Sequence, residues 1–450
     1  MIQMTLAQAA TVLGLKSFTD HSPFSGVSID TRTLEAGNLF VAIPGDHVDG
    51  HDYVEEALKQ GAVGALVTRR VDSAIPQILV ENIVTALGLL SAHWRQQFTL
   101  PIVAVTGSNG KTTLKNMIAA IMAAACHGNA ADVLATKGTL NNHLGLPLTL
   151  MRLDKKQRYA AIEMGMNHFG EILYLTKLTQ PNVAVITNAA AAHLEGVGDV
   201  EGVARAKAEI FAGLQKDGTA ILNRDDAFYA YWLEQIGQHK SLSFGFSPEA
   251  DVTALLHAAT QTQNITLTTP KGSIDIHLPL LGKHNVLNTL AAAAATLAVG
   301  IDLTAIKAGL ETIQPAPGRL QLHTLANGVK IIDDTYNANP FSLNAAVETL
   351  ATFAGKKILV LGDMRELGAD AASLHHAAGE NIRKAGIDYL FTYGELSSNT
   401  SQAFGEGAYH FNEQEKLVNA LKPFLYNTTT ILVKGSRSMR MEKVIAGLVQ

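Results

Sequence analysis

A strand, a glycine loop and a helix follow one another within residues 102–125, and this segment constrains the fold of the 450-residue chain more than any other. The strand runs into the string Thr-Gly-Ser-Asn-Gly-Lys-Thr-Thr at residues 106–113. Glycines let backbone N–H groups curl around phosphate oxygens, and the N-terminal end of a helix adds positive dipole. Lys111 would reach the outer phosphates of a nucleotide, and the Thr112 hydroxyl would ligate Mg²⁺. The segment therefore predicts a phosphate site.

The glycine spacing of this loop departs from the common phosphate-loop pattern GxxxxGK[ST]. That pattern would place its first glycine at Val105, whereas the first glycine here is Gly107. An alternative interpretation is a Gly/Asn turn before a helix, with Lys111 incidental. The coincidence of strand, loop and helix favours the phosphate site. We therefore expect a nucleotide to be bound by Gly107, Ser108, Asn109, Gly110, Lys111, Thr112 and Thr113.

Short β-branched runs alternate with helical segments along most of the chain, which predicts an α/β protein with mostly parallel sheets covered by helices on both faces. No GxGxxG follows any of these runs, which argues against a dinucleotide-dependent oxidoreductase. The predicted strands lie at residues 39–43, 64–67, 77–80, 102–105, 159–162, 183–186, 219–222, 329–332, 357–361, 389–392 and 430–433.

The length of the chain requires more than one domain, because single cores stop growing at about 250–300 residues. Residues 1–84 are predicted to form a small α/β domain and residues 85–314 a central domain around the phosphate loop. Pro315 and Pro317 interrupt a helical stretch and mark the second boundary. Residues 315–450 are predicted to form a doubly wound, Rossmann-like domain.

Composition and charge exclude several classes of partner and location. The net charge is -5 and the basic residues are scattered, so a nucleic-acid partner is not expected. The single cysteine, Cys126, suits a reducing compartment. Residues 1–15 carry no basic region or cleavage pattern of an export signal, and the longest apolar stretch, 287–301, is too short for a membrane span. We expect a cytoplasmic protein that is not inserted in a membrane.

Two candidate metal ligands follow predicted strands of the central domain. Glu163 ends the run at 159–162, and His193 comes shortly after the run at 183–186. Parallel sheets present ligands at the carboxyl ends of their strands, and Mg²⁺ prefers carboxylate oxygens. Taken alone, a histidine in this position is more often a hydrogen-bonded loop residue than a metal ligand.

Taken together, these motifs resemble the Mur ligase family. The matching positions, in chain order, are 106–113, Asn141 and Asn142 with Gly145 and Pro147, Glu163, His193, and Gly282-Lys283-His284-Asn285 followed by Asn288. The resemblance implies a metal site for two Mg²⁺ ions at Thr112, Glu163 and His193. It also implies that His284, Asn285 and Asn288 lie against the adenine of ATP, and that Asn141, Asn142 and Asn167 face a muramyl-peptide substrate.

The family also carries a lysine that CO₂ converts to a carbamate, an anion able to bridge to the second Mg²⁺. The segment 204–211 matches that region and selects Lys207. Carbamylation requires an uncharged amine, so the resemblance implies a pocket that lowers the pKa of Lys207. Lys111, Lys207 and His193 are the implied catalytic residues. Without the family, Lys207 would be an ordinary solvated helix lysine.

The two ends of the chain resemble one branch of the family. Ser28, Asp30, Thr31, Arg32 and Gly45 match a region that holds UDP, although residues 28–32 alone would fit a capped turn equally well. In the C-terminal part, the segments 333–340 and 362–368 resemble the D-alanyl-D-alanine-adding branch. Tyr336, Asn337 and Asn339 are the implied substrate contacts there. Arg319 and Asp334 match positions that contact nucleotide phosphates and ribose, which implies that the third domain closes over ATP.

The resemblance thus implies a monomeric ligase that adds D-alanyl-D-alanine to UDP-N-acetylmuramoyl-tripeptide through an acyl phosphate. Two alternatives stay open. One is a diamino-acid-adding or folate-polyglutamylating ligase of the same family, and the other is a nucleotide-operated switch or transport ATPase. The general base for the incoming amine is also open among His193, Asp334 and His375. A metal site at His375 and His376 is rejected because neighbours on a helix point apart.

Overall fold

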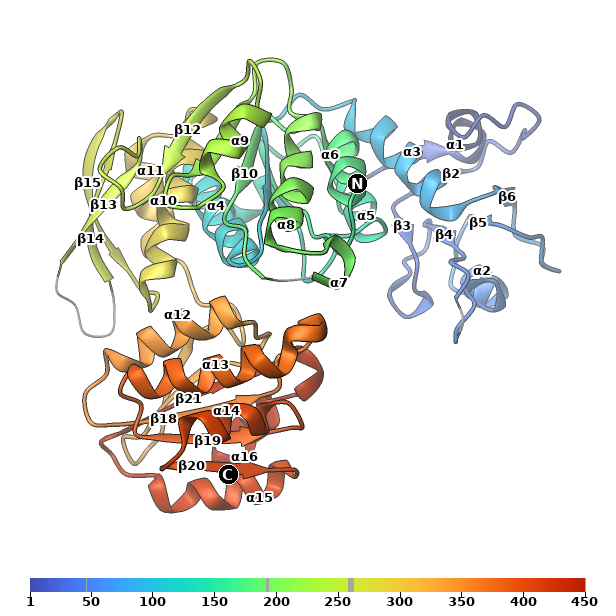
Figure 1. The fold of residues 1–450 in the computed structure, drawn as a ribbon. Helices are drawn as coiled ribbons and strands as arrows, with labels where there is room; N and C mark the ends of the chain where they lie inside the picture. The colour runs from blue at the N-terminus through green and yellow to red at the C-terminus, as the bar shows by residue number, and fades with distance from the viewer. Residues whose placement is uncertain (46, 192–193, 258–262, 450) are drawn as a thin grey trace.

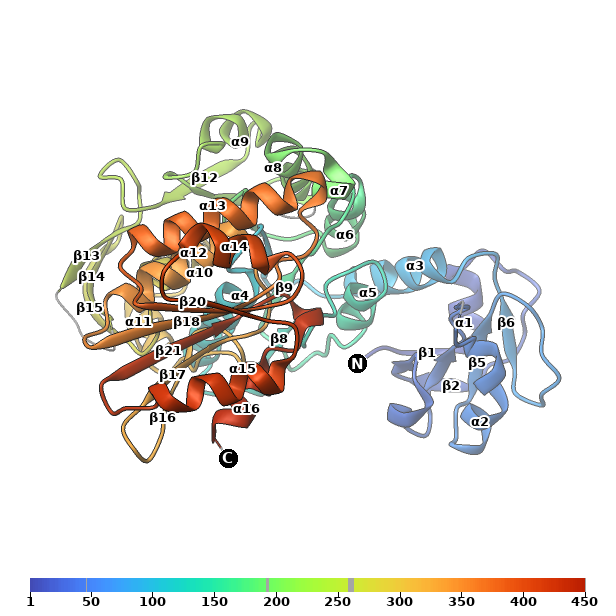
Figure 2. The ribbon, with the colours of Figure 1, turned by 60° about the horizontal axis from the view of Figure 1, so that its bottom comes forward.

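The structure, a computed structural model, describes residues 1–45, 47–191, 194–257 and 263–449. Three bodies are visible in Figure 1. A small N-terminal domain lies to one side of a large central domain, and the C-terminal domain lies below the central one. Figure 2, from a second direction, shows the N-terminal domain apart from the other two, with helix α3 (Ile83–Arg95) leading from it into the central domain.

The N-terminal domain is built on a small parallel sheet. Its strand order is β3-β4-β5-β6, and a separate antiparallel pair, β1 and β2, lies beside it. Phe40, Ala65 and Val67 are buried against one face. The elements of the domain are β1 (Gln3–Thr5), α1 (Leu6–Val12), β2 (Pro23–Ser25), β3 (Val27–Ser28), β4 (Leu39–Val41), α2 (Val54–Lys59), β5 (Gly64–Val67) and β6 (Gln77–Leu79).

The central domain carries a fully parallel six-stranded sheet in the order β12-β11-β10-β7-β9-β8. Its strands are β7 (Ile102–Thr106), β8 (Val133–Ala135), β9 (Tyr159–Glu163), β10 (Val183–Ile186), β11 (Thr219–Asn223) and β12 (Lys240–Phe244). Its helices are α4 (Lys111–Ala125), α5 (Gly145–Leu150), α6 (Glu171–Thr179), α7 (Leu194–Val197), α8 (Val200–Ala208), α9 (Tyr229–Gln235), α10 (Lys283–Ala298) and α11 (Leu303–Glu311).

Both faces of this sheet are covered, and strand β7 shows how. Ile102 and Ala104 belong to the cluster that includes α3, α6 and α8. Val103 and Val105 alternate with them and pack against α4, α10 and α11. Side chains alternate along a strand, so a run of apolar residues is the signature of a strand buried on both sides.

An antiparallel three-stranded sheet, not predicted from the sequence, extends the second of these layers. Its strands are β13 (Thr253–His257), β14 (Gln263–Thr269) and β15 (Gly272–Leu278). Ile265, Leu267, Ile276 and Leu278 point into the same core as α4 and α10. This sheet covers the outer side of α11 (Figure 1).

The C-terminal domain is a doubly wound sheet in the order β16-β17-β21-β18-β19-β20, with β16 antiparallel to the others. Helices α12, α13 and α14 pack on one face and α15 and α16 on the other. The elements are β16 (Gln321–Thr324), β17 (Lys330–Asp334), α12 (Pro340–Ala351), β18 (Lys356–Gly362), α13 (Ala371–Lys384), β19 (Tyr389–Tyr393), α14 (Ser397–Phe404), β20 (Ala408–Phe411), α15 (Gln414–Leu421), β21 (Thr429–Lys434) and α16 (Glu442–Val449).

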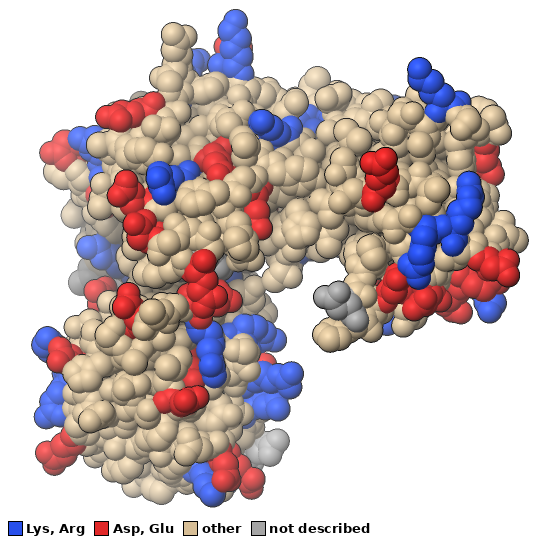
Figure 3. All heavy atoms as spheres, turned by 45° about the vertical axis from the view of Figure 1, so that its right-hand side comes forward, with Lys and Arg blue, Asp and Glu red and all other residues tan. Residues whose placement is uncertain are grey.

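The predicted α/β class and the predicted strands are confirmed, each within a residue or two. The stretch expected to be a buried helix lies within and just beyond α10, whose alanines 291–295 are buried. Among the described residues, no helix is long and apolar enough to cross a membrane. On the face drawn in Figure 3, basic and acidic side chains are interspersed, with no continuous basic stripe.

Candidate active site

The loop after β7 has a backbone that only glycine accommodates at two positions. Gly107 has φ +150°, and a Cβ there would lie 1.7 Å from Oγ1 of Thr187. Gly110 has φ +84° and directly precedes α4, and a Cβ there would lie 2.5 Å from Oδ1 of Asn288. Left-handed backbone and close contact both favour glycine. The turn therefore brings backbone N–H groups to the positively polarised start of α4.

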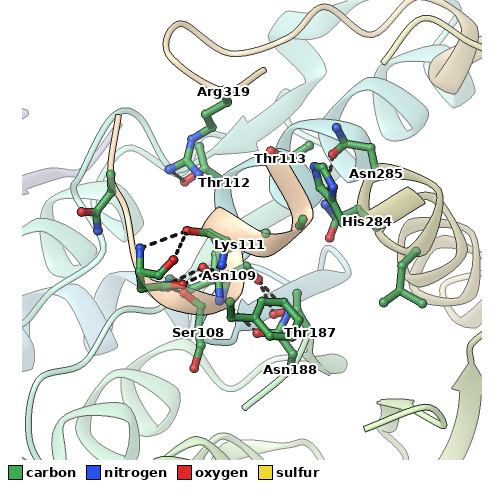
Figure 4. A pocket seen from close by; sticks show the side chains of 18 of the residues that line it. Ser108, Asn109, Lys111, Thr112, Thr113, Thr187, Asn188, His284, Asn285 and Arg319 are labelled. Atoms are coloured by element: carbon green, nitrogen blue, oxygen red, sulfur yellow. Dashed lines mark hydrogen bonds between the residues drawn. The ribbon is translucent and has the colours of Figure 1, made fainter. Parts of the chain in front are cut away.

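The loop is fixed from the neighbouring strand end. The backbone N–H of Ser108 donates to the carbonyl of Asn188 at 3.0 Å, and that of Asn109 donates to Oδ1 of Asn188 at 3.0 Å. The hydroxyl of Thr187 donates to the carbonyl of Asn109 at 2.7 Å. These contacts are drawn in Figure 4. Because Thr187 and Asn188 directly follow β10, the two adjacent strands hold the loop rigidly.

Lys111, at the start of α4, folds back over the loop. Its Nζ donates to the carbonyl of Gly107 at 2.6 Å and to that of Ser108 at 3.4 Å. Burial lowers the pKa of Lys111, an effect that the nearby carboxylate of Glu163 opposes. A cation held over a ring of backbone N–H groups is suited to binding an anion.

Glu163 ends β9 beside this loop, as predicted. The side chain is 2% exposed, and Oε1 accepts a hydrogen bond from Nδ2 of Asn141 at 2.8 Å. Its second oxygen, Oε2, is buried and has no hydrogen-bond partner. A buried carboxylate oxygen without a partner costs free energy, so this atom fits a cation ligand. His193, the other predicted metal ligand, lies outside the described residues.

The described residues contain no group of three His, Cys, Asp or Glu side chains that could hold a metal ion by themselves. Glu163 ends β9 and Thr112 lies in the first turn of α4, so these two residues alone are not a ready-made cage. Mg²⁺ commonly binds through one or two protein ligands plus waters and substrate phosphates. Glu163 and Thr112 provide such a small set of oxygen ligands.

Lys207 lies in α8, close enough to Lys111 to feel its charge. Its side chain is 2% exposed. Burial lowers the pKa of Lys207 well below its usual value, and the charge of Lys111 lowers it further. A lysine this deeply buried favours the neutral amine, the condition that carbamylation requires.

The start of α10 forms another wall of the site. Burial lowers the pKa of His284 to about 4, so the ring is neutral at physiological pH. Nδ2 of Asn285 donates to the carbonyl of Leu281 at 2.7 Å, and Asn288 donates to Oδ1 of Asn285 at 3.2 Å. Figure 4 shows His284 and Asn285 on the far side of the loop from Ser108. A neutral aromatic ring with amides nearby suits a planar base.

The C-terminal domain contacts the loop directly. Nη2 of Arg319 donates to Oγ1 of Thr112 at 3.2 Å, and its guanidinium lies 4.1 Å from the centre of the Tyr336 ring. Nδ2 of Asn339 donates to Oδ1 of Asn109 at 3.0 Å. The predicted approach of the third domain to the nucleotide loop is thus present in the structure.

A buried ion pair lies in the part of the C-terminal domain that faces the loop. Nζ of Lys434 lies 2.6 Å from Oδ2 of Asp334 and also donates to the carbonyl of Asn337 at 2.8 Å. Lys434 is 2% exposed, so its charge depends on Asp334. Lys434 was not predicted as a site residue. Its position directly after the predicted strand 430–433 is the signal that could have identified it.

One cavity of about 1380 Å³ brings these groups together between the central and C-terminal domains. The predicted residues that line it are Ser108, Asn109, Gly110, Lys111, Thr112, Thr113, Asn141, Asn142, Glu163, Asn167, His284, Asn285, Asn288, Arg319, Asp334, Tyr336, Asn337 and Asn339. Arg365 and Lys434 also line it. Lys207 is not among its lining residues.

The predicted UDP-binding residues lie apart from this cavity, in the N-terminal domain. The hydroxyl of Ser28 donates to the carbonyl of Asp30 at 2.9 Å, and the Asp30 carboxylate caps the turn of Thr31 and forms an ion pair with Arg32. This is the capped turn that residues 28–32 also predicted. Gly45 lies in a loop of the same domain.

Comparison with known proteins identifies the family to which this fold and site belong. Three family models cover most of the chain: the Mur ligase family catalytic domain at residues 23–94, the Mur ligase middle domain at 105–296, and the Mur ligase glutamate ligase domain at 318–437. The UDP-N-acetylmuramoyl-tripeptide--D-alanyl-D-alanine ligase of Escherichia coli (strain K12) is 44% identical over 454 residues, covering 100% of this chain and 99% of the relative. This chain belongs to the Mur ligase family.

Solved structures agree with this assignment to the Mur ligases. A crystal structure of MurF from Acinetobacter baumannii matches with a TM-score of 0.93 at 36% identity, covering 100% of this chain and 99% of that one. The MurF ligase of Thermotoga maritima, crystallised in complex with ADP, matches with a TM-score of 0.84 at 26% identity and covers 94% of this chain and 97% of that one. The three-domain α/β architecture is therefore that of a Mur ligase.

Proposed function

We propose that this Mur ligase uses ATP to join D-alanyl-D-alanine to UDP-N-acetylmuramoyl-tripeptide through an acyl phosphate. The observation that carries the proposal is the cavity itself, where the phosphate loop of the central domain meets the segment 333–340 of the C-terminal domain. The full-length similarity to the E. coli ligase named for this reaction supports it. In this scheme residues 1–84 hold the UDP end, residues 85–314 hold ATP, and residues 315–450 bring the dipeptide. The reaction is placed in the cytoplasm, where ATP is made available.

The reaction requires two anions to meet. The terminal carboxylate of the tripeptide attacks the γ-phosphorus of ATP, the bond to the β-phosphate oxygen breaks, and ADP leaves. The amine of the dipeptide then attacks the acyl carbon, inorganic phosphate leaves, and the amine loses a proton. Lys111 and the N–H groups at the start of α4 offset the repulsion at the first step, since they lie where negative charge concentrates. Asn141 and Asn142 line the cavity from the sheet side, where they would orient the peptide.

Residues of the site fit Mg²⁺. Oε2 of Glu163 would hold the ion together with Oγ1 of Thr112, and the predicted His193 would complete the set. Bound Mg²⁺ supplies neutralisation of the phosphate charge during transfer. Asn141 would keep Glu163 oriented by its hydrogen bond to Oε1.

Carbamylation of Lys207 is part of this proposal. The neutral amine attacks CO₂, a C–N bond forms, and one proton is released, leaving a carbamate anion. The burial of Lys207 and its position beside Lys111 support this step, because both favour the uncharged amine before the reaction and Lys111 stabilises the anion after it. A carbamate at this position would supply oxygen ligands for a second Mg²⁺.

Two of the candidate bases for the incoming amine are described by the structure, and they differ. His375 is fully buried, with Nε2 accepting from the backbone N–H of Met364 and Nδ1 next to the carbonyl of Ala371. Both ring nitrogens are engaged away from the cavity, so His375 supports a loop and does not take the proton. Asp334 lines the cavity and remains a candidate.

A product assay tests the proposal. The protein is incubated with ATP, Mg²⁺, D-alanyl-D-alanine and each UDP-N-acetylmuramoyl-tripeptide, ending in meso-diaminopimelate or in lysine, and phosphate and product mass are followed. With one of the two tripeptides we expect phosphate release and a product whose mass equals that of the tripeptide plus the dipeptide minus water. Amide formation with a free diamino acid or glutamate instead would assign another branch of the family. ATP hydrolysis that needs no acceptor amine would support the switch or transport alternative.

A further inference from the structure

A loop of the C-terminal domain, residues 363–367, carries a feature that the reaction above does not use. It follows β18 and precedes α13. The side chains of Met364 and Leu367 are buried in the domain core, at 0% and 3% exposure. Arg365 and Glu366, between them, line the cavity. The loop therefore uses two apolar residues as anchors and presents two charged ones to the site.

The backbone of this loop is braced by contacts with two other segments. The backbone N–H of Ser436 donates to the carbonyl of Asp363 at 3.0 Å, and the N–H of Arg365 donates to the hydroxyl of Ser436 at 2.8 Å. The N–H of Met364 donates to Nε2 of His375 at 3.0 Å. Burial lowers the pKa of His375, which keeps that nitrogen available as an acceptor. The position of Arg365 is thus fixed at its backbone.

The side chain of Arg365 has an ion-pair partner in the same loop. Asp363 is fully buried, and its Oδ1 accepts a hydrogen bond from the backbone N–H of Ser397 at 2.8 Å. Its Oδ2 lies 3.2 Å from Nη2 of Arg365, an ion-pair contact without hydrogen-bond geometry. A Cβ at Gly394 would lie 2.4 Å from the Asp363 carboxylate, so the carboxylate occupies a tight pocket. Burying a carboxylate is unfavourable unless it is paired, and this one orients a single guanidinium.

Arg365 differs from other cations of the cavity wall in how much of it is engaged. Arg319 donates to Thr112 and lies over a tyrosine ring, and Lys434 is buried against Asp334. The Arg365 side chain is 50% exposed, and Asp363 is its one side-chain partner in the described part of the chain. A guanidinium has five N–H donors, and Asp363 approaches only one nitrogen of Arg365. Arg365 therefore has donors left for an anion in the cavity.

We propose that Arg365 binds the C-terminal carboxylate of the incoming dipeptide and that Asp363 is a positioning residue for it. The inference rests on the proposed function. The triphosphate is assigned to the loop at 107–112, and the tripeptide carboxylate must reach the same place. Arg365 comes instead from the C-terminal domain, which brings the other substrate. A carboxylate held there leaves the amine end of the dipeptide free to point toward the acyl phosphate.

The sharpest test compares D-alanyl-D-alanine with its C-terminal amide, which keeps the amine and both methyl groups but lacks the carboxylate. For the unaltered enzyme we expect kcat/KM to fall roughly 10- to 100-fold with the amide, the range for losing a charge-assisted hydrogen bond. In Arg365→Ala this discrimination should shrink to about 2-fold or less, because the carboxylate has no partner left. Arg365→Lys keeps the charge beside Asp363 and should retain part of the discrimination between the acid and the amide. Equal discrimination in the unaltered enzyme and in both variants overturns the proposal.

Further readouts separate folding, the ligase reaction and the carboxylate contact. Hydroxylamine replaces the dipeptide and traps the acyl phosphate as a hydroxamate, so hydroxamate formation should be unchanged in both Arg365 variants. Lys384→Ala removes an exposed cation of the same domain outside the cavity lining and should alter neither measurement. No hydroxamate with the unaltered enzyme would refute the proposed function. If hydroxamate forms but the unaltered enzyme uses the dipeptide and its amide equally well, only the role proposed for Arg365 is refuted. A raised KM for the nucleotide-linked tripeptide, with that for the dipeptide unchanged, would also refute it.

Discussion

Replacing Gly107 with alanine tests the geometry of the phosphate loop. The new Cβ would lie 1.7 Å from Oγ1 of Thr187 and 2.9 Å from its Cβ, so Thr187 must move. That movement breaks the hydrogen bond from Thr187 to the carbonyl of Asn109, worth about 0.5–1.5 kcal/mol. Alanine at φ +150° adds backbone strain of about 1–3 kcal/mol. Together these terms predict a loss of roughly 2–4 kcal/mol.

Gly128→Ala is a matched control for this variant. Gly128 also has positive φ, +83°, but a Cβ there has no neighbour within 4 Å. It should therefore lose only about 1–2 kcal/mol, from strain alone. Thermal unfolding followed by circular dichroism, together with ADP release, measures both variants. We expect the transition of Gly107→Ala to fall by roughly 4–16 °C with ADP release lost, and Gly128→Ala to fall less and remain active. A Gly107→Ala enzyme with the stability and ADP release of the unaltered protein would refute the close-contact argument.

Three further predictions concern titratable residues of the site. Lys111→Ala should keep its melting temperature but lose roughly 100- to 1000-fold in ADP release, because it removes a cation aimed at the phosphates. Lys207→Met should abolish product formation and bicarbonate dependence. Burial lowers the pKa of Lys207, so below pH 10.5 the unfolded chain binds a proton that the folded chain does not. The free energy of unfolding of the unaltered protein should therefore rise with pH toward 10.5, by up to about 1.4 kcal/mol per pH unit. Lys207→Met should remove this contribution to the pH dependence. The ring of His284, with a pKa of about 4, should titrate in NMR spectra between pH 3 and 5, and KM for ATP should not change from pH 6 to 8; a midpoint near 6.5 would contradict its burial.

The sequence predicted the parallel sheets well because their strands are buried on both faces. Residues 102–105 and 183–186 are apolar without interruption, and turns or helices follow them at once. The strands that were missed are short or partly exposed. Among them are Val133–Ala135, Lys240–Phe244 and Ala408–Phe411 of the two large sheets. In the antiparallel sheet, Thr253–His257 is largely exposed and only alternate residues of Gln263–Thr269 are buried, so neither segment is a continuous apolar run.

The candidate site was predictable where a residue is tied to a local motif. The loop at 106–113 and Glu163 at a strand end could be placed from neighbouring residues alone. Lys434 and Arg365 could not, since Lys434 pairs with Asp334 and the backbone of Arg365 is held by Ser436, and both partners are distant in sequence. The lowered pKa of Lys207 was implied by the resemblance alone, because the burial that causes it cannot be derived from the residues around α8 in the sequence.

The central claim is that the glycine turn before α4 binds the triphosphate. A crystal structure with a non-hydrolysable ATP analogue and Mg²⁺ tests it most directly. We predict β- and γ-phosphate oxygens within hydrogen-bond distance of the N–H groups of residues 110–112, with Nζ of Lys111 moved from the Gly107 carbonyl onto a phosphate. A structure in which the analogue binds elsewhere, and Lys111 stays on that carbonyl, would contradict the account.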